Sequence, residues 1–438
     1  MSAERQARAV WTVISEPGDP VAGELLAWVG ADRALTWVRS VRRGRVDWSV
    51  LEEPDATVLD SSQRGSSRRG SPALGASVPG SSAPGFAADG LPDGGFALGA
   101  SVRRRLVRRA QAWARRLDAA APALDVAARA GIDLVVPGDP HWPTGLDDLA
   151  AATPHALWLR GSLDGLSAAG SMSVALVGAR ACTAYGQRVA AELAAGLAVR
   201  GAVVVSGGAY GIDAAVHRGA LTGGVTWAVL AGGLDRDYPA GHRALFAQIV
   251  ADGGALLGEA PPGAVPARHR FLQRNRLIAA LTSGTVVVEA AWRSGALSTA
   301  NHAAGLLRPV GAVPGPVTSV ASAGCHRLLR EGTAVCVTDA AEVVELVGPI
   351  GTRPVGPVDA PTADPARTTL LDGLDGGARV VHDALSVRTA TTTAALVEST
   401  GHSTSAVRAA LGRLDLAGLV VRDGEGWRAV PVRGSSSG

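Results

Sequence analysis

Two arginines and an asparagine closely follow a phenylalanine in the stretch Phe271-Leu-Gln-Arg-Asn-Arg276. Planar guanidinium groups match phosphate oxygens, and an aromatic ring offers a face on which a base can stack. Neither a nucleophile nor a cluster of metal ligands accompanies them in this stretch. It therefore predicts a site that holds a polyanion, and we expect no catalytic residue, no metal and no cofactor.

Short apolar runs alternate with helical segments from residue 171 to residue 347, and these elements must position the charged stretch. Uninterrupted apolar strands are buried on both faces of a sheet, and helical spacers between them indicate parallel crossovers. We expect an α/β fold: an extended Rossmann-like, mostly parallel, doubly wound sheet. The expected strands are 174–177, 202–205, 226–230, 255–257, 285–288 and 309–313.

Glycines and small polar residues follow most of these runs. Ligands of open α/β sheets lie at the carboxyl ends of the strands, where helix N-termini present free N–H groups. Arg180 adds a fixed charge after the first run, while Arg274 and Arg276 add two more before the fifth. The expected phosphate-binding residues at the strand ends are Gly178, Arg180, Gly186, Ser206, Gly207, Gly208, Gly211, Gly232, Ser294 and Gly295.

Nucleotide-cofactor and NTPase functions are disfavoured. The first strand is not followed by a Gly-x-Gly-x-x-Gly fingerprint, and the chain contains no lysine for a Walker motif. Glu289 is the best general-base candidate, although a carboxylate at a strand end can simply accept backbone N–H groups. We interpret His217 as a packed, hydrogen-bonded histidine.

The composition of the 438 residues suits folded domains, with 47% hydrophobic residues and a formal net charge of +3. All 42 basic side chains are arginines, so every cationic contact is a fork-shaped donor. Cys182, Cys325 and Cys336 are widely spaced, which suits reduced thiols and neither a disulfide frame nor a zinc site. With no expected signal peptide or membrane span, we predict a cytoplasmic protein.

Composition shifts divide the chain. A segment rich in Ser, Pro, Ala and Gly cannot bury enough surface to order itself, so it predicts a disordered insert. The expected parts are a small helical region over 1–60, this insert over 61–100, an Arg-rich helical remainder over 101–170, the Rossmann-like domain over 171–347, a linker over 348–370 and a winged helix over 371–434.

The last part predicts three short helices followed by a hairpin with Asp423-Gly424 at its turn, which is the layout of a winged helix. Ser403 would cap the third helix, from which Arg408 and Arg413 would project as secondary DNA candidates. Winged helices bind DNA or dock proteins, and the sequence leaves both open.

Several motifs follow one another at the spacing of one known family. They are Val177-Gly-Ala-Arg180, Ser206-Gly-Gly-Ala-Tyr-Gly-Ile-Asp213, Ala228-Val-Leu-Ala-Gly-Gly-Leu-Asp235 with Tyr238-Pro239, Phe271-Leu-Gln-Arg-Asn-Arg276, Ser294-Gly-Ala-Leu-Ser-Thr299 and Val313-Pro-Gly315. In this respect residues 130–347 resemble the DNA-processing protein A family (DprA, also called Smf).

The resemblance implies a non-enzymatic single-stranded-DNA-binding protein of natural transformation and recombination. Such a protein forms a homodimer through its Rossmann-like domain and helps to load the recombinase RecA. By motif match, Arg180, Ser206, Gly207, Gly232, Phe271, Arg274, Asn275 and Arg276 would line its pocket, with Arg268 and Arg270 on the rim. The resemblance does not identify the surface that contacts RecA.

The rival hypothesis is an enzyme. Lysine-decarboxylase-like nucleoside-monophosphate phosphoribohydrolases also have a glycine-rich Rossmann-type sheet with a phosphate pocket. They carry the signature Pro-Gly-Gly-x-Gly-Thr-x-x-Glu, which Thr282-Ser-Gly-Thr-Val-Val-Val-Glu289 lacks. A purely structural scaffold would leave the clustering of arginine and glycine unexplained.

Overall fold

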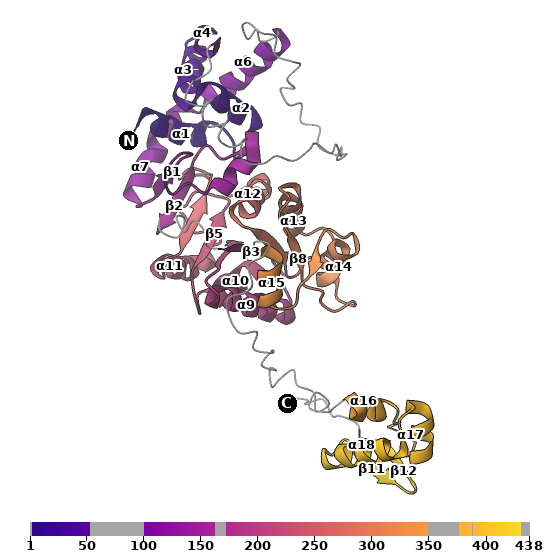
Figure 1. Ribbon diagram of the computed structural model, residues 1–438. Helices are drawn as coiled ribbons and strands as arrows, with labels where there is room; N and C mark the ends of the chain where they lie inside the picture. The colour runs from indigo at the N-terminus through magenta and orange to yellow at the C-terminus, as the bar shows by residue number, and fades with distance from the viewer. Residues whose placement is uncertain (1, 53–99, 163–171, 349–375, 388, 431–438) are drawn as a thin grey trace. The chain divides into compact units, whose positions relative to one another are not determined.

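The computed structural model describes residues 2–52, 100–162, 172–348, 376–387 and 389–430 (Figure 1). The chain divides into two compact units, residues 1–352 and 353–438, each of which is described by itself. The insert predicted over 61–100 lies outside the described residues, except for residue 100. Of the linker predicted over 348–370, only residue 348 is described. Within these residues, no helix combines the length and the apolar character that crossing a membrane requires.

A nine-stranded sheet forms the centre of the first unit, in the order β1-β2-β6-β5-β4-β3-β7-β8-β9. All neighbours from β6 to β9 are parallel, whereas β2 runs antiparallel to both β1 and β6. The chain adds β4 to β6 on one side of β3 and β7 to β9 on the other. The predicted doubly wound, mostly parallel sheet is confirmed. The strands are β1 (Asp133–Val135), β2 (Leu157–Gly161), β3 (Ser173–Val177), β4 (Val203–Gly207), β5 (Thr226–Leu230), β6 (Ala255–Gly258), β7 (Gly284–Val287), β8 (Val310–Ala312) and β9 (Val335–Cys336).

Helices cover both faces of the sheet, because the central strands are apolar on both sides. One core lies beneath α12 (Arg268–Leu281), α13 (Ala296–Gly305) and α14 (Ala323–Arg330). The opposite face is covered by α9 (Ala184–Val199), α10 (Ile212–Ala220), α11 (Arg243–Ala251) and α15 (Ala340–Val347). These crossovers leave the loops at the carboxyl ends of the strands free to form a site.

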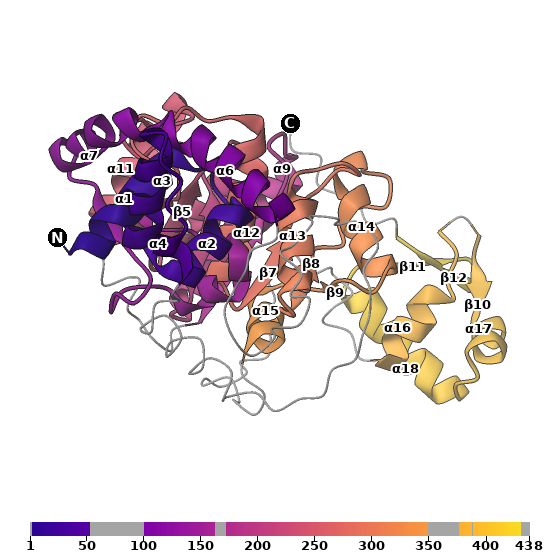
Figure 2. The same ribbon diagram turned by 90° about the horizontal axis from the view of Figure 1, so that it is seen from above.

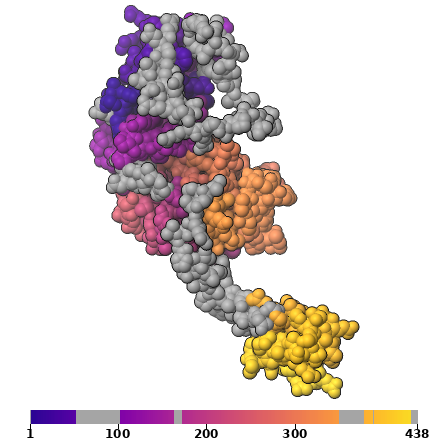
Figure 3. Space-filling view, in the orientation of Figure 1, coloured from indigo at the N-terminus to yellow at the C-terminus, as the bar shows by residue number. Residues whose placement is uncertain are grey.

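A small helical region (Figure 3, indigo to purple) packs against the sheet, where Ala9 and Ala127 join a core that includes Trp158 of β2. Its own core contains the fully buried rings of Trp11 and Trp37 and the nearly buried ring of Trp113. Asp19 caps its second helix by accepting from the backbone N–H groups of Val21 and Ala22. The helices are α1 (Ala3–Ile14), α2 (Pro20–Val29), α3 (Ala31–Arg42), α4 (Ser49–Glu52), α6 (Ala100–Ala114) and α7 (Ala120–Arg129).

Two features of this region differ from the sequence-based expectation. Within the Arg-rich helical remainder expected over 101–170, a break separates α6 from α7, because Pro122 is accommodated in the first turn of a new helix. In addition, β1 and β2 extend the sheet with an antiparallel pair that was not expected. Strand β9, at the opposite edge of the sheet from β1, was not predicted from the sequence either.

The second unit is the predicted winged helix. Three helices precede a hairpin, and Ser403 caps the third helix by accepting from the N–H of Ala406 at 3.3 Å. The turn is formed by Gly424 and Glu425, one residue beyond the predicted Asp423-Gly424, because Asp423 pairs with Gly426 as the last residue of β11. A further short strand pairs with the hairpin. The elements are α16 (Gly376–Asp383), β10 (Thr391–Thr392), α17 (Thr393–Thr400), α18 (Thr404–Leu416), β11 (Val420–Asp423) and β12 (Gly426–Ala429).

Candidate nucleic-acid interface

A cleft of about 550 Å³ opens at the carboxyl ends of β3, β4 and β7. Its walls are the loops after these strands and the first half of α12, which lies at the point where strand order reverses around β3. Open α/β sheets bind their ligands at this position. The lining residues are Val177, Gly178, Arg180, Ala209, Asp213, Tyr238, Pro266, Arg268, Phe271, Leu272, Arg274, Asn275, Ile278, Arg293, Ser294, Gly295, Ala296 and Thr299.

One face of α12 forms a wall of the cleft. Phe271, Arg274, Asn275 and Ile278 all line it, and they follow the i, i+3, i+4, i+7 spacing of a single helix face. The helix begins at Arg268 and therefore includes the whole Phe271–Arg276 stretch. Because the stretch is helical, its side chains are divided between the cleft and the opposite face of α12.

Aromatic rings stand at the mouth of the cleft. The guanidinium carbon of Arg180 lies 4.6 Å from the centre of the half-buried Phe271 ring. The Tyr238 ring, which is 51% exposed, lies 6.1 Å from Phe271 between ring centres. A smaller hollow of about 60 Å³ adjoins the cleft and shares both rings, and Gly208, Tyr210, Gly232 and Arg236 also line it. These rings provide surfaces on which bases can stack.

The charge of the cleft is predominantly positive. Four arginines line it, namely Arg180, Arg268, Arg274 and Arg293, against the single carboxylate of Asp213. Arg180, Arg268 and Arg293 are exposed, and none of the three forms an ion pair with a residue that the structure describes. Guanidinium groups without an internal partner are available to phosphate oxygens.

Arg274 has a different environment, because its side chain is 8% exposed. It donates from Nη1 to the carbonyl oxygen of Val229 at 2.5 Å, while Asp213 accepts from the N–H of Ala209 at 3.1 Å. Burial raises the pKa of Asp213, and the nearby Arg274 charge opposes that rise. Gly207 makes the arrangement possible, since a Cβ at this position would overlap both the Arg274 guanidinium and the Asp213 carboxylate.

Several predicted binding residues support the loops instead of lining the cleft. Ser206 is fully buried and donates its hydroxyl to the carbonyl oxygen of Leu176 at 2.7 Å. Gly211 adopts φ +81° where the backbone closely approaches the carbonyl oxygens of Ala179 and Arg180. Neither of them, nor Gly207, is among the residues that line the cleft. In this respect the structure differs from the predicted pocket.

Glu289 and Gly186 form a structural contact. The Glu289 carboxylate is 1% exposed and accepts from the N–H and the hydroxyl of Thr183, at 2.9 and 2.6 Å. A Cβ on Gly186 would overlap this carboxylate, so Gly186 makes room for it and is not a phosphate ligand. Glu289 thus joins the start of α9 to the end of β7. This agrees with the interpretation of Glu289 as a strand-end carboxylate that accepts backbone N–H groups.

The predicted role of Arg276 is also corrected. Its Nη2 donates to both carboxylate oxygens of Glu259, at 2.8 and 2.9 Å, on the face of α12 that points away from the cleft. The side chains are 3% and 6% exposed. Glu259 also accepts from the N–H of Gly18 at 3.0 Å, so this pair joins α12 to the loop between α1 and α2.

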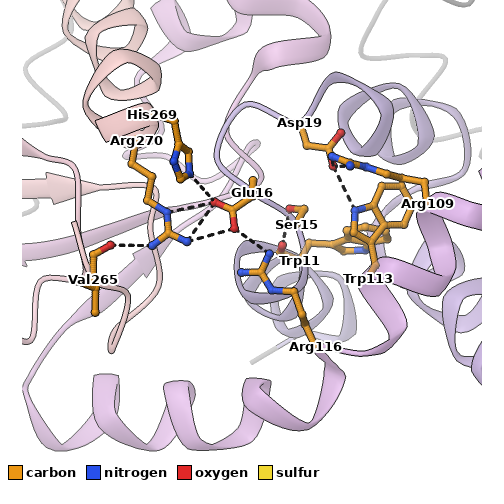
Figure 4. Close-up of polar contacts among 10 residues, drawn as sticks. All are labelled: Trp11, Ser15, Glu16, Asp19, Arg109, Trp113, Arg116, Val265, His269 and Arg270. Atoms are coloured by element: carbon orange, nitrogen blue, oxygen red, sulfur yellow. Dashed lines mark hydrogen bonds and ion pairs between the residues drawn. The ribbon is translucent and has the colours of Figure 1, made fainter. Parts of the chain in front are cut away.

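Arg270, in the first turn of α12, is held by Glu16 (Figure 4). Two guanidinium nitrogens of Arg270 donate to Glu16 at 3.1–3.2 Å, and Arg116 donates to the same carboxylate at 3.0 Å. Burial opposes ionisation of Glu16, but Arg270 and His269 outweigh it and lower the pKa. Arg270 therefore connects α12 to the helical region and does not line the cleft.

The far end of α12 is held by Arg308. Its Nη1 donates to the carbonyl oxygens of Ala279, Ala280 and Thr282, and its Nη2 donates to Gly145 at 3.0 Å and to Asp148 at 2.8 Å. These carbonyls are the last of α12 and would otherwise lack partners. The helix that forms the cleft wall is thus anchored along its length.

His217 is packed, as the sequence suggested. It is fully buried, with Nε2 2.8 Å from the carbonyl oxygen of Gly207 and Nδ1 2.8 Å from the hydroxyl of Thr226. Burial lowers its pKa to about 4. It connects the end of β4 to β5 beneath the cleft.

Sequence reasoning omitted some lining residues. Arg293 and Thr299 line the cleft, and Tyr210 and Arg236 line the adjoining hollow. Arg293 follows β7 and Arg236 follows β5 by a few residues, so the strand-end rule applied to the glycines would have found both. Of the residues that were predicted, Gly178, Arg180, Arg268, Phe271, Arg274, Asn275, Ser294 and Gly295 line the cleft, and Gly208 and Gly232 line the hollow.

Among the secondary candidates, Arg408 and Arg413 are both exposed on α18 of the second unit. Exposure leaves the choice between DNA contact and protein docking open for this unit. Within the described parts of the chain, no group of three or more His, Cys, Asp or Glu residues is arranged to hold a metal ion.

Comparison with known proteins gives consistent matches. Residues 133–348 match the family DNA recombination-mediator protein A, and residues 359–426 match the DprA winged helix domain. A DNA processing protein DprA of Mycobacterium tuberculosis is 48% identical over 326 residues, covering 72% of this chain and 81% of the relative. Protein Smf of Escherichia coli is 42% identical over 193 residues, covering 44% of this chain and 50% of the relative.

Two solved structures are also similar. The X-ray structure of DprA from Streptococcus pneumoniae has 34% sequence identity and a TM-score of 0.49, covering 55% of this chain and 84% of that one. A structure of DNA processing protein A from Helicobacter pylori, described as giving insight into its single-stranded DNA binding mode, has 29% identity and a TM-score of 0.44. It covers 49% of this chain and 96% of that one.

Proposed function

This chain belongs to the DNA recombination-mediator protein A family, also called DprA or Smf, and we propose that its cleft binds single-stranded DNA. The observation that carries the proposal is the cleft itself. Three exposed arginines without ion-pair partners among the described residues, Arg180, Arg268 and Arg293, line the cleft, and Arg180 lies over the ring of Phe271. This combination offers charge to phosphates and a stacking surface to bases.

A single strand suits this geometry better than a duplex. Stacking on Phe271 and Tyr238 requires bases whose faces are free, and in a duplex those faces are covered by neighbouring base pairs. The arginines reach phosphates without reading base edges, so we expect little sequence preference.

We further propose that the protein helps to load the RecA recombinase on the strand it holds, as a homodimer paired through its sheet domain in the cytoplasm. The support is membership of a family of recombination mediators. Analytical ultracentrifugation tests the dimer. A strand-exchange assay with RecA and a single-strand-coating protein tests the loading, because a mediator should shorten the lag before exchange.

The strand-binding proposal is tested by fluorescence anisotropy with labelled oligo-dT and a duplex of equal length, across a salt series. Four arginines at a slope of −0.7 per phosphate contact predict a slope of about −3 in log K against log salt. The triple variant Arg180→Gln, Arg268→Gln, Arg293→Gln, called the cleft variant, should lose about 2 of this slope and most of the affinity. These side chains are exposed, so the fold should persist.

A matched control changes as many charges at the opposite edge of the sheet. Arg200, Arg218 and Arg330 are exposed at the C-terminal ends of α9, α10 and α14, which lead into the amino ends of strands. The control variant with glutamine at these positions should bind like the parent. Tighter binding to duplex, a flat salt profile or a cleft variant that binds normally would overturn the proposal.

The enzyme hypothesis gives a separate outcome. Incubation of the parent protein with AMP would release free adenine if the chain were a nucleoside-monophosphate phosphoribohydrolase. The carboxylate that such chemistry would require, Glu289, is buried and accepts two hydrogen bonds from Thr183. We expect no base release, and its detection by chromatography would replace our proposal.

A further inference from the structure

The exposed half of α6 carries a row of arginines that the cleft does not use. Arg104, Arg105 and Arg108 on α6 and Arg115 directly after its end are exposed, while Leu106, Ala110, Trp113 and Ala114 fill the buried half of the helix. From Arg104 to Arg115 the row spans about 16 Å at the helical rise of 1.5 Å per residue. We call these four residues the α6 row.

The α6 row has no partner among the residues that the structure describes, in contrast to its neighbours. Arg109 pairs with Asp19 at 2.6 Å, and Arg116 pairs with Glu16 at 3.0 Å. No ion pair or hydrogen bond joins any of the four residues of the row to a described carboxylate. The arginines that hold the helical region together are thus paired with carboxylates, whereas the described residues provide no carboxylate partner for the row.

The row costs the isolated helix stability. Arg104 and Arg108 are like charges at i, i+4 spacing, which is destabilising. Packing within the described residues therefore gives no reason for the row, whereas a polyanion lying along it would.

The row is continuous with the cleft through residues already described. Arg116, next in sequence to Arg115, shares the Glu16 carboxylate with Arg270 of α12 (Figure 4). Arg268, at the first position of α12, lines the cleft. An open groove of about 700 Å³ has Arg116, His269 and Arg270 on its wall. The Arg116–Glu16–Arg270 contact therefore links the segment that follows α6 to the start of α12, where Arg268 lines the cleft.

We propose that the α6 row is a second contact for the single strand bound in the cleft, made to phosphates alone. This inference rests on the proposed function. The other exposed positions between Arg104 and Arg115 are Arg109 and Gln111, so this surface presents guanidinium groups and no aromatic ring to bases. The row should lengthen the bound segment by at most about five nucleotides, taking 3.4 Å per stacked nucleotide.

The test compares short and long oligo-dT on a variant of the row. The row variant is Arg104→Gln, Arg108→Gln, Arg115→Gln, in which glutamine keeps the helix propensity. A short strand of about 6 nucleotides should fit the cleft alone, and one of about 25 should reach α6, since single-strand-binding folds cover roughly 4–16 nucleotides each. The control variant at Arg200, Arg218 and Arg330 removes equal charge elsewhere.

We expect the row variant to bind the short strand like the parent and the long strand more weakly. The salt slope for the long strand should fall by about 2, from three lost contacts at 0.7 each. The cleft variant should lose both strands, which separates failure of this inference from failure of the proposed function. The inference would be overturned by a row variant that binds the long strand like the parent, that loses affinity for both strands equally or that loses affinity for duplex only. An equal loss of long-strand affinity in the control variant would also overturn it.

Discussion

The guanidinium group of Arg180 lies over the ring of Phe271, 4.6 Å from its centre, across the mouth of the cleft. The two side chains come from the loop after β3 and from α12, and they offer a charge and a stacking face at one point. A nucleotide bound here could contact both. Their contributions are separable, because only one of them depends on salt.

Phe271→Ala should weaken binding of oligo-dT by about 1–3 kcal/mol, the cost of one lost base stack, and leave the salt slope unchanged. Arg180→Gln should reduce the slope by about 0.7, for one phosphate contact. Anisotropy titrations at several salt concentrations measure both quantities. If the Phe271 variant instead changes the salt slope and keeps its affinity at high salt, the ring positions Arg180 and does not stack on a base.

Arg276 gives a prediction of the opposite kind. Arg276→Met should destabilise the fold by about 3–5 kcal/mol, because it leaves the buried Glu259 carboxylate without its partner. Adding Glu259→Gln should recover part of the loss, since a neutral amide oxygen can still accept from Gly18. Urea unfolding measures both variants. Under conditions in which it remains folded, the Arg276 variant should bind oligo-dT like the parent. A variant that keeps full stability but loses binding would indicate that Arg276 contacts the strand in the cleft.

Helical geometry explains why the sequence did not separate Arg274 from Arg276. The stretch was expected to precede a helix, whereas α12 begins at Arg268. Two residues apart on a helix, the side chains point about 200° away from each other at 3.6 residues per turn. Only one of them can face the cleft.

Much of the fold followed from local pattern. Six parallel strands were found because each is a run of apolar residues that is buried on both faces. β9 has only two residues, and β1 begins with the exposed Asp133, so neither gives such a run. The partner of Arg270 could not be predicted, because Glu16 lies 254 residues from it in the chain and contacts it only once the helical region packs on the sheet.

Buried histidines predict a loss of stability in acid. Burial lowers the pKa of His155 to about 3 and that of His217 to about 4, from 6.5. The fold therefore favours their neutral forms, so its stability is complete above pH 6.5 and falls as the pH drops toward these values. At pH 5 each histidine should cost about 2 kcal/mol relative to pH 7.

The measurement is urea unfolding between pH 7 and 5, with His217→Gln as the comparison. In the variant, the slope of unfolding free energy against pH should be smaller by the contribution of about one proton taken up on unfolding, whatever the variant's absolute stability. Asp213 and Asp147, whose pKa values are raised by burial, oppose the trend in both proteins and cancel in the comparison. An unchanged slope would mean that His217 is charged in the fold.

Helix α12 is held at three places: by Glu16 through Arg270, by Glu259 through Arg276 and by Arg308 at its last carbonyls. A wall fixed in this way is preorganised, so a strand that enters the cleft need not first wait for the protein to rearrange. Association should then proceed at a rate set by diffusion and electrostatic steering, and strands of different sequence should differ mainly in how long they stay bound.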